Sequence, residues 1–197
     1  MSYEEISLIE QRKLFAFRCY VRKNGLQSVS QTRLVMSNWE KGIKVFLNHH
    51  DLDQEAMEYV LTNHSSGIFP IYLKSRSLNA KSEIFLIQKG NIDNLRDYIS
   101  WGFLFSEDAE IALVHRCNYD LLRKYAVLQK TLQPQSEATL IANAPKDMVK
   151  WYIEQYGVFI TSKAHVYKRK DQELIDVMLK SHKATVDYSD NVCLKNF

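Results

Sequence analysis

Basic side chains recur at a fixed interval along this chain of 197 residues. They lie 26 or 27 residues apart, or twice that distance, at Arg18, Lys44, Arg96, Arg123 and Lys150. A periodic fold would place these cations side by side in a basic ladder, and such a ladder could contact phosphates or an acidic peptide. The alternative is that they form a solvated outer face that keeps the chain in solution. The net charge of only +3 favours this second interpretation.

Possible metal ligands gather in the segment HHDLDQE, residues 49–55. Adjacent histidines are poorly placed to bind one ion, and no spacing such as HxxxH supports a site. We therefore expect no metal and no cofactor.

Three cysteines, Cys19, Cys117 and Cys193, are far apart and form no CxxC pair. This pattern predicts reduced thiols in a cytoplasmic protein rather than a disulfide framework or a zinc site. Cys117 follows His115 by two residues, a spacing that points the side chains apart on a helix. We expect Cys117 to be a small structural residue and not a nucleophile.

The N-terminal segment, residues 1–13, is acidic where a signal peptide requires positive charge. No stretch approaches the roughly 18 consecutive apolar residues of a membrane span. We therefore expect a cytoplasmic protein without a membrane anchor.

The elements that would position these residues are repeated. SEIFLIQKGNIDNLRDYI at 82–99 is echoed by AEIALVHRCNYDLLRKYA at 109–126 and by SEATLIANAPKDMVKWYI at 136–153. The same period of 26–27 residues carries an aromatic column through Tyr20, Phe46, Tyr72, Tyr98, Tyr125 and Tyr152. A fixed period of this length is typical of a solenoid or a similar array.

Each copy has the pattern of two short helices. Leu95, Tyr98 and Ile99 stand at i, i+3 and i+4, and Asp93 lies in the first turn, where a carboxylate favours the helix dipole. This spacing excludes a strand. Leu26, Leu52, Leu78 and Leu104 mark the connections between copies. In the third copy, Pro70 predicts a kinked helix or one that starts late.

The predicted fold is therefore all-α, an α-solenoid of about seven tandem helix-turn-helix repeats in one domain, residues 1–182. The aromatic column is expected to form the core between copies rather than a row of exposed anchors. Residues 183–197 fall outside the period, and we expect this tail to pack partly on the last copy, through Val186, Tyr188, Val192 and Leu194.

The wording AEIALV-x-R-x-N-x-D-x-L-x-x-Y resembles two-helix repeats of the HEAT-like kind. More narrowly, it is similar to repeats in uncharacterised bacterial proteins labelled microneme/rhoptry antigen. The resemblance covers about residues 4–182 and implies a packing scheme rather than a chemistry. Some HEAT-like proteins are DNA base-excision enzymes, an analogy that would require a perturbed carboxylate in a pocket near Trp101 or Trp151.

The functional expectation is a non-enzymatic scaffold that binds a protein or peptide along the array. The alternative is binding of nucleic acid or an acidic partner along the basic ladder. No Gly-rich phosphate loop, G-x-S-x-G or HExxH motif supports an enzyme. The oligomeric state stays open, because end copies could stack between chains.

Overall fold

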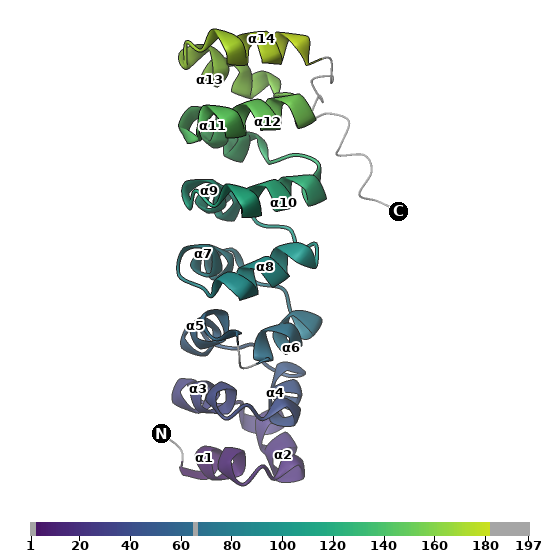
Figure 1. Ribbon diagram of the computed structural model, residues 1–197. Coiled ribbons are helices and arrows are strands. Elements are labelled where there is room, and N and C mark those ends of the chain that lie inside the picture. Colours follow the sequence, from purple (N-terminus) through teal and green to yellow (C-terminus); the bar gives the residue numbers. More distant parts are fainter. Residues whose placement is uncertain (1–2, 65–66, 182–197) are drawn as a thin grey trace. The chain divides into compact units, whose positions relative to one another are not determined.

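The computed structural model describes residues 3–64 and 67–181, and those ranges contain α-helices, one 3-10 helix and no strand (Figure 1). The chain divides into two compact units, Met1–Tyr98 and Ile99–Phe197, which are described separately. The predicted packing of the tail, residues 183–197, lies outside the described residues. The prediction of a single repeat domain over residues 1–182 stays a prediction.

The first unit consists of helices paired in sequence order. First helices of successive copies pack on one another (α3 on α5, α5 on α7), and second helices do the same (α2 on α4, α4 on α6). The bounds are α1 Tyr3–Glu10, α2 Leu14–Asn24, α3 Ser28–Met36, α4 Glu40–Leu47, α5 Gln54–Thr62, α6 Ile68–Ser75, α7 Ala80–Gln88 and α8 Ile92–Ser100, with the unit boundary inside α8.

The second unit repeats the arrangement. The first helix α11 packs on α9 and on α13, and the second helix α12 packs on α14. The bounds are α9 Glu107–His115, α10 Tyr119–Gln129, α11 Pro134–Asn143, α12 Lys146–Tyr156, the 3-10 helix η2 Ile160–Ser162, α13 Lys163–Lys168 and α14 Gln172–Lys180. The described residues thus form seven helix pairs at the predicted period, and the all-α repeat fold is confirmed.

Helices of six to eleven residues are marginal alone in water, so packing between copies must stabilise them. Residues at the predicted rows supply that packing. Leu86 and Ile87 on α7, Leu95 on α8 and Leu140 on α11 are each 0% exposed. The repeating apolar rows are therefore the core of each unit.

The third copy shows how a proline is accommodated. Helix α6 begins at Ile68, four residues before its column residue Tyr72, whereas α8 begins six residues before Tyr98. Pro70 consequently falls in the first turn of α6, where backbone N–H groups have no intrahelical partner. Of the two outcomes expected for Pro70, the late start is the one observed.

The aromatic column lies inside the units, as predicted. Phe46, Tyr72, Tyr98, Tyr125 and Tyr152 are each at most 2% exposed, and only Tyr20, in the first copy, is of intermediate exposure. The column therefore forms part of the core and offers no row of exposed anchors.

The four leucines lie in connections between copies, but they are not buried alike. Leu26, Leu52 and Leu78 are at most 9% exposed, but Leu104 is 58% exposed. Phe105, which is 3% exposed, takes its place, and its ring packs on Tyr125 with 5.1 Å between centroids. The interval lengthens from 26 to 27 residues at this point, which moves the buried position by one residue.

This shift predicts opposite outcomes for two neighbouring truncations. Phe105→Ala should lower the free energy of unfolding by about 3–5 kcal/mol, because it leaves a cavity against Tyr125. Leu104→Ala should change it by less than about 0.5 kcal/mol. Urea denaturation of both variants measures the difference; a larger loss for Leu104→Ala would contradict the buried role of Phe105.

Candidate interaction surfaces

The structure places the basic ladder on the second helices of their copies, and local carboxylates engage most of it. Lys44 lies 3.6 Å from Glu40, and Arg96 lies 2.8 Å from Asp93. Arg18 is exposed on α2. These cations are partly neutralised at short range, which weakens their field toward a distant phosphate.

The last two ladder residues take part in a mixed cluster of the second unit. Arg123 lies over the ring of Trp151 at 5.3 Å, a cation–π contact. Lys150 donates to Glu173 at 2.6 Å, and Lys146 lies 2.7 Å from the same carboxylate. Hydrogen bonds from Lys146 and then Lys150 lower the pKa of Glu173 to about 2. The cluster thus joins α12 to α14 through shared charge.

The residues of the HHDLDQE segment have structural partners. His50 hydrogen-bonds the backbone oxygen of Val21 at 2.8 Å. Asp51 accepts from the Tyr72 hydroxyl at 2.9 Å, and Asp53 caps α5 by accepting from the backbone N–H of Ala56. Among the described residues, no three His, Cys, Asp or Glu side chains are grouped to hold a metal ion.

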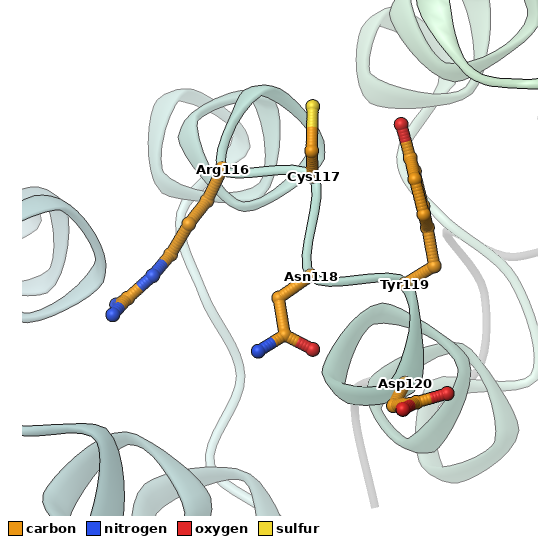
Figure 2. A pocket seen from close by; sticks show the side chains of 5 residues that line it. All are labelled: Arg116, Cys117, Asn118, Tyr119 and Asp120. Atoms are coloured by element: carbon orange, nitrogen blue, oxygen red, sulfur yellow. The ribbon is translucent and has the colours of Figure 1, made fainter.

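An open hollow lies at the turn between α9 and α10, lined by Arg116, Cys117, Asn118, Tyr119 and Asp120 (Figure 2). The Cys117 thiol and the Tyr119 hydroxyl project to the same side, away from the Arg116 side chain (Figure 2). The neighbouring Cys117 side chain raises the pKa of Tyr119 to about 12. The hollow contains neither Trp101 nor Trp151, near which the excision-enzyme analogy would require a perturbed carboxylate.

Cys117, expected to be a small structural residue, lies on the surface of the turn. It is exposed, at a positive φ of 58°, and its thiol donates to the backbone oxygen of His115 at 3.3 Å. The turn directs this side chain outward. The hydrogen bond joins the thiol to the His115 backbone and not to the imidazole.

Buried carboxylates pair with the tyrosines of the aromatic column, a feature that the sequence analysis missed. In four copies the tyrosine hydroxyl donates to a glutamate fifteen residues earlier, on the first helix of the same copy. The pairs and their O···O distances are Tyr20–Glu5 3.2 Å, Tyr98–Glu83 3.0 Å, Tyr125–Glu110 2.7 Å and Tyr152–Glu137 3.1 Å.

The second carboxylate oxygen reaches the following copy. Glu5, Glu110 and Glu137 accept from backbone N–H groups of the next connection, those of Gln27 at 3.4 Å, Gln133 at 2.9 Å and Phe159 at 2.8 Å. Each glutamate thus joins its own helix pair to the start of the next one. We call this arrangement the carboxylate bridge.

The other copies show what the bridge requires. The second copy has Phe46, which has no hydroxyl, and there Gln31 replaces the glutamate while still accepting from Asp53 N–H at 2.8 Å. The third copy has Met57 at the glutamate position, and Asp51 accepts from Tyr72 instead. Glutamate therefore accompanies tyrosine in four of the five copies that have a tyrosine, and an amide accompanies the one phenylalanine. This covariation between the two positions is the sequence signal for these pairs.

Burial shifts the pKa values of these carboxyl groups upward. Desolvation raises the pKa of Glu110, against the hydrogen bonds from Gln133, Tyr125 and Ser136. It raises the pKa of Glu137 to about 7, against those from Phe159, Ser162 and Tyr152. Both residues are at most 3% exposed, so these carboxyl groups lie within the core of the second unit.

Four apolar side chains that follow two successive column tyrosines are exposed in the second unit, and we call them the exposed apolar row. They are Trp101 (48% exposed), Leu104 (58%), Val127 (60%) and Leu128 (49%). Trp101 and Leu128 hold equivalent places, three residues after a column tyrosine. The backbone N–H of Phe105 donates to the Tyr125 hydroxyl at 3.1 Å, which holds the loop carrying Leu104 against α10.

Comparison with known protein families, with curated proteins and with solved structures gives no match to this chain. The HEAT-like resemblance therefore stays an expectation about the sequence. None of the described helices is long and apolar enough to cross a membrane.

The second copy has Gln31 and Phe46 where the fifth copy has Glu110 and Tyr125. This pair predicts that the effects of mutating Glu110 and Tyr125 on the free energy of unfolding are not additive. Tyr125→Phe alone should lower the free energy of unfolding by about 1–3 kcal/mol, because Glu110 and the Phe105 N–H each lose a buried partner. Glu110→Gln with Tyr125→Phe should be less destabilising than the sum of the single changes, by about 0.5–3 kcal/mol. Chemical denaturation of the four proteins gives the coupling; strict additivity would contradict the bridge.

The raised pKa of Glu137 predicts a pH dependence. The folded state binds this proton more tightly than the unfolded state, so stability from Glu137 is present below about pH 4.5 and is lost as pH rises through about 7. The total change is on the order of 3 kcal/mol, from the pKa difference.

Denaturation of the protein and of the Glu137→Gln variant at several pH values separates the contribution of Glu137 to stability from that of other titrating groups. The difference in stability between the two proteins should change across that pH range and level off above about pH 8. A difference that does not vary with pH would contradict the shift.

Proposed function

We propose that this protein is a non-enzymatic helical-repeat scaffold that binds a protein partner through the exposed apolar row of its second unit. The observation that supports the proposal is the exposure of Trp101, Leu104, Val127 and Leu128 on neighbouring segments of that unit. Large exposed apolar side chains are common in interaction sites, and tryptophan is enriched among the residues that contribute most to binding.

Residues of the apolar row follow or precede buried residues directly in the chain. Tyr125 and Ala126, which directly precede Val127, are at most 1% exposed, and Phe105, which follows Leu104, is 3% exposed. Because the chain beside these apolar side chains is already held by buried neighbours, it loses little conformational freedom when a partner binds. The apolar row is therefore suited to a partner that brings its own apolar residues.

Nucleic-acid binding along the basic ladder has weaker support. Of the five ladder residues, Lys44, Arg96 and Lys150 have carboxylate partners within 4.0 Å, and Arg123 lies on an indole ring. A phosphate would have to displace those partners before it gained a full charge interaction. The enzyme analogy has less support still, because the two carboxyl groups with raised pKa values, Glu110 and Glu137, are buried within the bridge.

A site-specific photo-crosslink tests the proposal. A benzoyl-phenylalanine at Leu128 should form an adduct with one protein in the source cell, and Trp101→Ser in the same chain should reduce its yield by about tenfold, since interface tryptophans often contribute more than 1 kcal/mol. The matched control carries the photoreactive residue at Val29, which is similarly exposed on α3.

Equal adducts from positions 128 and 29, or none that depend on Trp101, would contradict this function. Adducts that disappear after nuclease treatment would instead favour the nucleic-acid alternative.

A further inference from the structure

The last described copy, α13 and α14, exposes two positions that every earlier copy buries. Tyr167 is 48% exposed and Leu179 is 64% exposed. The equivalent residues of the preceding copy, Ile141 and Ile153, are both 0% exposed. In the remaining copies both rows are at most 8% exposed, at Ile9, Val35, Leu61, Ile87, Val114, Val21, Leu47, Leu73, Ile99 and Ala126.

The first copy also has a face that no other described copy covers, and its residue types differ from those of α13 and α14. Glu4 and Ala16 are exposed there, at rows that later copies bury. The equivalents in the sixth copy, Ser136 and Met148, are 0% and 2% exposed. A carboxylate and a methyl group can face water at small cost, whereas Tyr167 and Leu179 expose much more apolar surface. The end face formed by α13 and α14 thus has the composition of a covered face.

The second unit shows what covers such a face. The first helix of one copy packs on the first helix of the preceding copy, α11 on α9 and α13 on α11. These helices share a pattern: a small buried residue, then an acid in most copies, and an apolar pair four and five residues after the small residue. Ser136, Glu137 and the pair Leu140–Ile141 are an example, and all four are at most 1% exposed.

The sequence beyond α14 repeats this pattern once more. SDNVCL at 189–194 matches SEIFLI at 82–87, with Ser189 as the small residue, Asp190 as the acid and Cys193–Leu194 as the pair. The interval also agrees, since Ser189 lies eleven residues after Met178, as Ser136 lies eleven after Tyr125. The intervening chain is therefore long enough to reach the end face.

We propose that the end face formed by α13 and α14 is the docking site of residues 189–194 of the same chain. The seventh copy has Lys163 and Met178 where other copies have the glutamate and the tyrosine, so no carboxylate bridge assists this contact. The docking depends on apolar burial over Tyr167 and Leu179, and it is weaker than the contacts between earlier copies.

Thiol labelling of Cys193 tests the proposal, because Cys19 and Cys117 are exposed and can be replaced by serine. In the 197-residue chain carrying both replacements, Cys193 should react at least about tenfold more slowly than in a synthetic peptide of residues 183–197. Leu179→Asp should restore the rate of the peptide. Met36→Asp is the matched control, since Met36 is 51% exposed on α3, outside the apolar row and the end face, and it should leave the rate unchanged.

Equal labelling rates in the chain and the peptide would overturn the proposal, as would protection that Leu179→Asp does not remove. Protection that grows with protein concentration would also overturn it, because a second chain would then occupy the face. Circular dichroism of the Leu179→Asp chain verifies that its helices are retained, so that a faster reaction reports loss of docking and not unfolding.

Discussion

A buried carboxylate shared between two successive copies is the constraint on which the repeat depends. In the second unit, Glu110 and Glu137 each accept from a tyrosine hydroxyl of their own copy and from a backbone N–H of the next connection. Apolar burial is non-directional and would tolerate sliding between short helices. Hydrogen bonds in a medium of low dielectric constant are directional, and leaving one unmade is costly. The bridge therefore sets how successive helix pairs are aligned, and the apolar rows supply most of the stability of that alignment.

The same constraint explains which surface is left for binding. The tyrosines and glutamates of the carboxylate bridge in the second unit are buried and hydrogen-bonded to one another. Most cations of the ladder are paired with neighbouring carboxylates. The large apolar side chains that are exposed on the second unit include Trp101, Leu128 and their neighbours, and Tyr167 and Leu179 at the end face of α13 and α14. A scaffold that binds by burying apolar area is consistent with that distribution.

Prediction from the sequence succeeded where a signal recurs in every copy. The i, i+3, i+4 spacing around Tyr98 and the first-turn Asp93 are local, so they predicted helix pairs and their period. The sequence did not indicate which residue is buried where the register shifts: Leu104 continues the interval of 26, but Phe105 is buried because packing on Tyr125 decides the position. The exposure of Cys117 was not visible in the sequence either, since a turn with positive φ directs its side chain outward.

The sequence by itself determined the all-helical repeat, its period and the burial of the aromatic column, because periodic apolar spacing specifies which face of each helix leaves water. Only the tertiary structure decided which groups become partners. Glu137 and Tyr152 are fifteen residues apart, and Phe159 is a further seven along the chain, so their hydrogen bonds exist only once two helices and the next connection have packed. The pairing of ladder cations with acids likewise depends on the tertiary structure. Lys150 on α12 contacts Glu173 on α14, two residues that folding brings together.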